Sequence, residues 1–457
     1  MAALLLLALT LLISTGLHAY FNTFMLSLGA GSPAWTSPFF SGDQFGDFIK
    51  LGLAYVKAGG QPIHETSVTQ YKPMLSDYLT SNPYSGDQAL AESALTYFHL
   101  PPLYQIIAKL SGLAMTRFDP VLLYLTIVLL LVGWVLILTR TTLGEGKLWV
   151  LLSIIVVISY PSLFAIQRGN ITAYLSSLLI MTSVAIAALN QSRWLYSAMV
   201  LALAVSIRPN YILLACYIPI VILQNLTLRK RLHATLISIA FSILTYVFLM
   251  LTASWIVPGY SHETFRSAYS YYVQAYEFGS AGINFCSSPF RLIAYVMQEQ
   301  YQLDSSTFLN LLKMSMIVAG ALVTAWGFWL GYTKNARPSK SLFIALLGSV
   351  ISTPIFTDYH LLIFLAPILL SCLEMPVIPL TDISTKGFTA LELITTGLLL
   401  SPKSIPILSL NHHPVTVQLL LNPFIILLYF SIYLKYSSSF DIFKPIQWAK
   451  VRRRKSK

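Results

Sequence analysis

Residues 232–256 have the sequence LHATLISIAFSILTYVFLMLTASWI, an apolar run that directly follows the basic triplet Arg229-Lys230-Arg231. A helix of about 20 such residues crosses the ~30 Å hydrocarbon layer of a bilayer. The run is therefore typical of a membrane-spanning helix. Basic residues beside such a helix mark its cytoplasmic end, because Lys and Arg are retained on that side.

Similar apolar runs recur through the whole chain. Hydrophobic residues make up 56% of the sequence and charged residues 10%, against about 25% charged residues in soluble domains. This composition excludes a water-soluble globular enzyme and an intrinsically disordered chain. We predict an all-α polytopic membrane protein with one integral domain over 1–457 and about twelve transmembrane helices, near 3–22, 120–139, 147–165, 171–190, 194–207, 210–226, 232–256, 308–332, 341–356, 360–375, 387–402 and 416–435.

The basic residues predict the orientation of these helices. Alternate links carry Lys or Arg, and so does the basic tail at 444–457, which places both termini in the cytoplasm. Two long loops, about 31–119 and about 257–307, then lie on the exported side, and each is expected to carry a short amphipathic helix. The net charge of +12 is explained by these cytoplasmic anchors, and no nucleic-acid partner is expected. The run Met1–Ala19 also fits a signal peptide, but it lacks a basic n-region, which favours an uncleaved helix.

Uncommon polar residues gather at the exported ends of the predicted helices, far apart in sequence but on one side of the membrane. Such convergence predicts a single polar site at the membrane boundary. Arg forms forked hydrogen bonds with phosphate, and a carboxylate can accept a proton from an attacking hydroxyl. The residues are Asp43, Asp47, Lys50, Tyr97, His99, Tyr104, Arg168, Asn170, Arg208, Asn284, Arg291, Asp358 and His360.

Several of these residues also have a plain structural explanation. Asp47 is suited to cap a helix. Arg168 and Arg208 are suited to anchor helix ends by extending toward the lipid headgroups. Tyr97, His99 and Tyr104 are typical of the aromatic belt at a membrane surface. The three cysteines have no metal-ligand spacing, and no metal site is expected.

Six segments resemble the GT-C glycosyltransferases, and most closely the polyprenol-phosphate-mannose-dependent mannosyltransferases of glycosyltransferase family 87. Their order and spacing span about residues 43–370. The family has an Asp that opens a helix before a Gly-x-x-Pro turn, a Tyr-x-Tyr-Pro-Pro-Leu motif, a Gly-Gln-x-Asn segment, a Lys-Pro segment, an Asn-x-Ser loop and a late exported His. The matching segments are Asp47–Pro62, Tyr97–Leu103, Arg168–Asn170, Arg208–Asn210, Asn284–Ser288 and Asp358–His360.

The resemblance implies a GT-C fold and an inverting transfer of a hexose, most often mannose, from a polyprenyl-phosphate sugar to a lipid-linked or cell-envelope glycan. Asp47 corresponds to the catalytic base and His360 to the exported His beside the donor phosphate. Lys50, Arg168, Arg208 and Arg291 are assigned to the donor phosphate. The remaining polar residues are assigned to the acceptor or the sugar: Asp43, Tyr97, His99, Tyr104, Asn170, Asn284 and Asp358.

Partners implied by this interpretation are the lipid-linked donor, a glycan or glycolipid acceptor and membrane lipids, with no cofactor besides the donor. The expected location is the cell's inner membrane, or the endoplasmic reticulum membrane in a eukaryote. The altered Gly-Gln segment and the insert at about 64–96 indicate a sugar or acceptor different from those of typical members. Two alternatives stay open: a transporter or flippase of lipid-linked sugars, and a glycan polymerase or ligase that uses a lipid-pyrophosphate donor.

Overall fold

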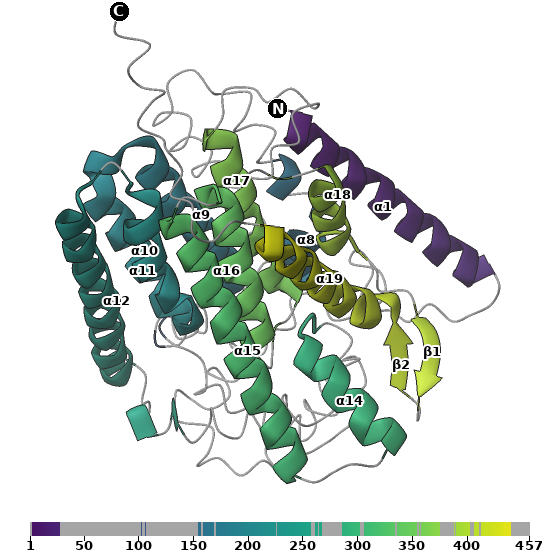
Figure 1. Cartoon of the computed structure of the whole chain (residues 1–457). Helices are drawn as coiled ribbons and strands as arrows, with labels where there is room; N and C mark the ends of the chain where they lie inside the picture. The colour runs from purple at the N-terminus through teal and green to yellow at the C-terminus, as the bar shows by residue number, and fades with distance from the viewer. Residues whose placement is uncertain are drawn as a thin grey trace, which may run out of the picture.

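The computed structural model describes a helical bundle in which long helices lie side by side (Figure 1). Most of the first predicted exported loop and the basic tail lie outside the described part of the chain. The residues described are 2–27, 102, 106, 154–156, 159–168, 171–224, 226–256, 261–263, 265–266, 286–301, 306–333, 336–353, 356, 358–374, 388, 390–402, 406–410 and 413–439.

Helical elements are described at every predicted run except 120–139, which lies outside the described residues. Most helix ends differ from the prediction by a few residues, but the helix Tyr160–Arg168 begins well inside the predicted run 147–165. In the first half the elements are α1 (Ala2–Ser27), α8 (Tyr160–Arg168), α9 (Ile171–Leu189), η4 (Gln191–Arg193), α10 (Trp194–Ile207), η5 (Pro209–Leu213), α11 (Leu214–Tyr217), η6 (Ile218–Ile222) and α12 (Leu228–Ile256). In the second half they are α14 (Pro289–Tyr301), α15 (Ser306–Tyr332), α16 (Pro338–Ser352), η9 (Asp358–Phe364), α17 (Leu365–Glu374), α18 (Ala390–Leu399), β1 (Pro406–Leu410), β2 (His413–Thr416) and α19 (Val417–Ser439).

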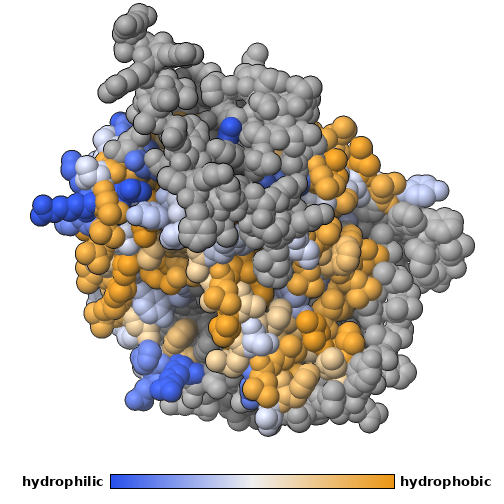
Figure 2. All heavy atoms as spheres, viewed as in Figure 1, coloured by the Kyte–Doolittle hydropathy of each residue, from blue (hydrophilic) through white to orange (hydrophobic). Residues whose placement is uncertain are grey.

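Two of the described helices are long and apolar enough to cross a membrane, namely Leu228–Ile256 and Thr307–Tyr332. At 1.5 Å per residue they measure about 39–44 Å. Their outer faces expose large apolar side chains, such as Phe248 at 66%, Leu251 at 67% and Leu322 at 66%. Figure 2 shows this apolar surface as an orange belt between hydrophilic patches. Large exposed apolar surfaces are rare in soluble monomers, so the belt favours a membrane protein.

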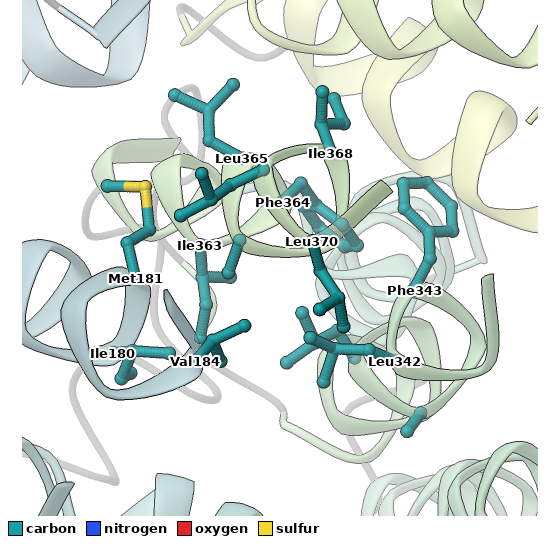
Figure 3. Close-up of a cluster of buried hydrophobic side chains, with 14 of the residues drawn as sticks. Ile180, Met181, Val184, Leu342, Phe343, Ile363, Phe364, Leu365, Ile368 and Leu370 are labelled. Atoms are coloured by element: carbon teal, nitrogen blue, oxygen red, sulfur yellow. The ribbon is translucent and has the colours of Figure 1, made fainter. Parts of the chain in front are cut away.

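The core lies where α9, α16, η9 and α17 meet (Figure 3). Met181 and Val184 of α9 face Ile363 and Leu365, and all four side chains are fully buried. On the other side of the same cluster, Phe343 packs its ring 5.0 Å from those of Phe364 and Tyr429. These contacts join α16 to η9 and α19.

Helices α15 and α16 approach each other at backbone distance, because small residues face each other across the contact. A Cβ added at Gly348 would lie 2.5 Å from the carbonyl oxygen of Gly320, and one added at Gly320 would lie 2.4 Å from that of Gly348. Small residues allow such close approach in apolar surroundings, where packing and not water exclusion joins the helices. The α15–α16 pair therefore has no space for a side chain at this crossing.

Residues 209–222 form an irregular helix that changes from a 3-10 turn (η5) through α11 to a π-helical turn (η6). Pro209 and Pro219 explain the change, because proline lacks the N–H group that an α-helix needs. Two carbonyl groups at the end of this segment accept hydrogen bonds from side chains of other segments: Arg231 donates Nη1 to the oxygen of Ile220 at 3.0 Å, and Gln191 donates Nε2 to that of Ile222 at 3.2 Å. The segment is thus fixed by its neighbours.

The described bundle is helical, as predicted, and one link adds a feature that was not predicted. The link between α18 and α19 contains a short antiparallel hairpin, β1–β2, with Leu410 opposite His413. Pro402, Pro406 and Pro414 disfavour a helix in this link. In the second predicted loop, the expected amphipathic helix is α14, which buries Phe290 and Ala294 against Leu309 of α15.

We predict that Gly348→Ala lowers the free energy of unfolding by about 1–3 kcal/mol, the usual cost of overpacking, because the new methyl group meets backbone atoms of α15. Thermal unfolding of the purified protein in detergent measures the effect. Gly16→Ala in α1 is the matched control, because nothing lies within 4 Å of a Cβ at that position. Equal unfolding temperatures for the two variants would contradict the close α15–α16 contact.

Candidate functional site

The described bundle has two chemically different ends. Helix α10 begins after Arg193 and ends before Arg208, and its 14 residues separate these arginines by about 21 Å. Helix α16 likewise begins after Arg337 and leads toward Asp358. We call the end with Arg193, Arg229–Arg231 and Arg337 the basic end, and the end with Arg208 and Asp358 the site end.

A buried hydrogen-bond chain holds the site end together. Ser287 donates Oγ–H to Oδ1 of Asp358 at 2.5 Å, and Asn422 donates Nδ2–H to Oγ of Ser287 at 2.9 Å. The backbone N–H of Ser287 also binds the carbonyl oxygen of Phe356 at 2.8 Å. The side chains of Ser287, Asp358 and Asn422 are fully buried. Segments around residues 287, 358 and 422 are thereby fixed to one another, and Asp358 is positioned without access to bulk water.

Arg291 and Cys286 lie against this chain from the second predicted loop. Arg291 in the first turn of α14 is 1% exposed, and Cys286 is close enough to Arg291 and Asp358 to interact electrostatically with both. Burial is the main cause that raises the pKa of the Cys286 thiol. A thiol with a raised pKa stays protonated near neutral pH and is a poor nucleophile. Cys286 is therefore suited to packing and not to covalent catalysis.

Arg208 and His360 form the second part of the site. The chain leaves α10 at Arg208 because the residue before a proline is pushed out of the helical conformation, and Arg208 has extended angles of φ −136° and ψ 89°. The Arg208 guanidinium lies close enough to the His360 imidazole for an electrostatic interaction. His360 in turn packs its ring 5.3 Å from that of Phe356.

The Nε–H group of Arg208 is buried and, among the residues described, has no hydrogen-bond partner. Buried polar groups are nearly always satisfied, so such an exception indicates a ligand or water. The Arg208 side chain as a whole is partly buried. An anion that accepts two parallel hydrogen bonds fits this position best.

The side chains of four predicted site residues are therefore described: Arg208, Arg291, Asp358 and His360. The contacts above link Arg208 to His360. They also link Asp358 to Arg291, through Ser287 and Cys286. Arg168 ends α8, and its side chain lies outside the described part. The other predicted residues also lie outside it: Asp43, Asp47, Lys50, Tyr97, His99, Tyr104, Asn170 and Asn284. Their roles stay predictions.

Sequence reasoning missed Ser287 and Asn422. Asn422 did carry a signal, because a lone amide inside an apolar run is costly in a membrane and is usually functional or structural. Ser287 lies in the matched segment Asn284–Ser288 but was given no role, since its role depends on partners 71 and 135 residues away. Both residues position Asp358 and are not expected to contact a substrate.

A separate buried ion pair lies away from this site. Lys340 of α16 and Glu392 of α18 approach to 3.2 Å, with side chains 6% and 3% exposed. Thr396 and Tyr429 donate hydrogen bonds to the backbone oxygen of Glu392. Within the described residues no group of three or more His, Cys, Asp or Glu side chains is arranged to hold a metal ion.

Comparisons of the chain with protein-family models, with curated proteins and with solved structures find no match. The function is therefore argued from the site itself.

We predict that Ser287→Ala destabilises the fold by about 1–3 kcal/mol, because it removes hydrogen-bond partners from two buried groups, Asp358 and Asn422. Thermal unfolding in detergent measures the loss. Ser254→Ala is the matched control: Ser254 lies on the exposed face of α12 and only donates to the Met250 carbonyl of its own helix. If both serines are equally dispensable, Ser287 does not hold the site together.

Proposed function

We propose that the chain is a GT-C-type membrane glycosyltransferase that moves a hexose from a polyprenyl-phosphate donor to a lipid-linked or cell-envelope glycan, with inversion at the anomeric carbon. The observation that carries the proposal is Arg208, a partly buried guanidinium with an unsatisfied Nε–H, beside His360 at one end of an apolar bundle. A lipid phosphate lies at this depth when its hydrocarbon chain is inserted in a bilayer.

The chemistry needs two kinds of group. The leaving phosphate carries negative charge as the glycosidic bond breaks, and fixed positive charge stabilises it in the transition state. In the proposal Arg208, Arg168, Lys50 and Arg291 provide this charge, and His360 helps to hold the phosphate by a hydrogen bond from its imidazole. The attacking hydroxyl of the acceptor loses a proton, and a carboxylate within hydrogen-bond reach accepts it.

Asp47 takes the role of this base, by its resemblance to the corresponding residue of glycosyltransferase family 87. The acceptor and the sugar are assigned to Asp43, Tyr97, His99, Tyr104, Asn170, Asn284 and Asp358. The buried environment of Asp358, between Ser287 and Arg291, supports an indirect role in which it orders the site end around the sugar.

The proposal includes about twelve membrane spans, with the site end exported and the basic end in the cytoplasm. Support comes from the agreement of the described helices with predicted spans and from the gathering of Arg193, Arg229–Arg231 and Arg337 at one end. The membrane is the cell's inner membrane, or the endoplasmic reticulum membrane in a eukaryote. Mannose is the first sugar to test.

We predict that Asp47→Asn abolishes sugar transfer, because the amide cannot accept the proton of the acceptor, while expression and unfolding temperature stay unchanged. Transfer of radiolabelled mannose from polyprenyl-phosphate-mannose to extracted glycolipids measures the activity. Glu263→Gln is the control and is expected to retain transfer, because Glu263 is an exposed carboxylate of the second predicted loop with no role in the proposal. Wild-type rates in Asp47→Asn would remove this residue from the mechanism.

We predict that Arg208→Gln lowers kcat/KM for the donor by about tenfold to hundredfold, the effect of losing a hydrogen bond to a charged group. Arg208→Lys keeps the charge but loses the forked geometry, so it should recover only part of the activity. Arg266→Gln serves as control, since Arg266 is an exposed arginine of the second predicted loop. A loss in Arg266→Gln as large as in Arg208→Gln would show a general charge effect and contradict a phosphate site at Arg208.

The main alternative is a transporter or flippase of lipid-linked sugars. The buried Lys340–Glu392 pair favours it, because ionisable groups inside an apolar bundle often mark a transport pathway. The two functions differ in their products. The test uses purified protein in vesicles that carry labelled donor. A transporter would move the intact donor lipid across the membrane. A transferase would release polyprenyl phosphate as it transfers the sugar. Transfer of the sugar or glycan from a lipid-pyrophosphate donor instead would identify a polymerase or ligase.

A further inference from the structure

The basic end of the bundle carries arginine side chains from three separate segments that meet around residues 217–223. Gln191, near Arg193, binds the carbonyl oxygen of Ile222, and Arg231 binds that of Ile220. Tyr217 donates its hydroxyl to the carbonyl oxygen of Pro338 at 2.7 Å, directly after Arg337. The three basic segments are thus joined to one irregular helix and cannot separate without breaking these contacts.

Arg231 and Arg337 keep unused hydrogen-bond donors in this region. Arg231 places its guanidinium 5.9 Å from the centre of the Tyr332 ring, and its Nε–H is buried without a partner in the described part of the chain. An Nη1–H group of Arg337 is likewise buried without a partner in the described part of the chain. Arg337 occupies the N-cap position of α16, and its side chain forms no capping hydrogen bond. A guanidinium has five donors, so both arginines can bind an acceptor from outside.

No carboxylate described at this end offers that acceptor. The described carboxylate side chains are those of Glu263, Asp358 and Glu392. Glu263 belongs to the second predicted loop, Asp358 to the site end, and Glu392 is paired with Lys340. Arg193, Arg229 and Lys230 add exposed positive charge nearby. An anion is suited to these donors, because it can accept hydrogen bonds from two guanidinium groups.

Apolar surface continues directly from these arginines. Leu228 and Leu232 at the start of α12 are 50% and 51% exposed, and Trp329 and Tyr332 at the end of α15 are 52% and 43% exposed. The Arg231–Tyr332 contact brings these two helix ends together. Figure 2 shows hydrophilic residues beside the apolar belt at the upper left, where α12 begins in Figure 1. A ligand that follows both surfaces has an anionic head and a hydrocarbon tail.

We propose that Arg231 and Arg337 form a binding site for the phosphate headgroup of an anionic membrane lipid at the basic end, distinct from the donor site at Arg208. The phosphate accepts hydrogen bonds from both guanidinium groups, and the lipid chains lie along α12 and α15. The site uses no residue of the proposed catalytic machinery, so its existence does not depend on the reaction.

The test uses the full-length protein in detergent with three probes: dioleoyl phosphatidic acid, dioleoyl phosphatidylcholine and inorganic phosphate. Native mass spectrometry counts retained lipid, and a titration gives affinity. The site variant is Arg231→Gln with Arg337→Gln. The matched control is Arg193→Gln with Lys230→Gln, which removes the same charge from exposed side chains.

We expect the protein to retain phosphatidic acid in preference to phosphatidylcholine, and the site variant to bind it about thirtyfold more weakly (~2 kcal/mol), at about 1 kcal/mol for each basic residue. Binding by the control variant should approach that of the wild type in 1 M salt, where the screening length is about 3 Å, while the site variant stays impaired. Should the site variant fail to fold, Arg337→Gln alone carries the test, since its side chain forms no cap on α16.

Two results would overturn the proposal. If both double variants lose binding equally and salt removes the difference from the wild type, the attraction is a diffuse surface effect without a site. If inorganic phosphate binds as tightly as phosphatidic acid and displaces it, the arginines bind free phosphate and the lipid chains contribute nothing.

Discussion

The hydrogen bonds of Ser287 join three parts of the chain that are distant in sequence. Its backbone N–H binds the carbonyl oxygen of Phe356, and its hydroxyl lies between Asp358 and Asn422. A buried carboxylate without such partners would be strongly unfavourable in apolar surroundings. These hydrogen bonds hold the start of α14 and the middle of α19 against η9, and Arg291 and His360 lie on two of the elements that they join.

Much of the helical architecture could be predicted from the sequence, because apolar runs as long as 232–256 and 308–332 have few other stable solutions. The structure confirms helices there and at most other predicted runs with described residues. The break at 209–222 was not predicted in detail, since the choice between α, 3-10 and π turns depends on side chains that arrive from elsewhere. The hairpin β1–β2 was missed because a short link between two helices gives little periodic signal.

For the site, the sequence identified the unusual residues but not their contacts. Arg208, Asp358 and His360 were recognisable because charged and ionisable groups at the ends of apolar runs are uncommon. Their grouping required the fold, and Asn422 was overlooked although it stands alone among apolar neighbours. Roles that depend on Asp47 and the first predicted loop rest on sequence resemblance alone.

The irregular helix at 209–222 has a consequence for how the protein is made. The Tyr217 hydroxyl forms hydrogen bonds with Pro338 and Ser341, more than a hundred residues later. The Ile220 carbonyl accepts a hydrogen bond from Arg231, which also follows it in the chain. Lipid cannot supply these partners. During synthesis this stretch leaves the ribosome before α16 exists, so it must wait beside the translocation machinery or in a provisional conformation. Biogenesis of this region is therefore complete only after the last third of the chain has begun to emerge.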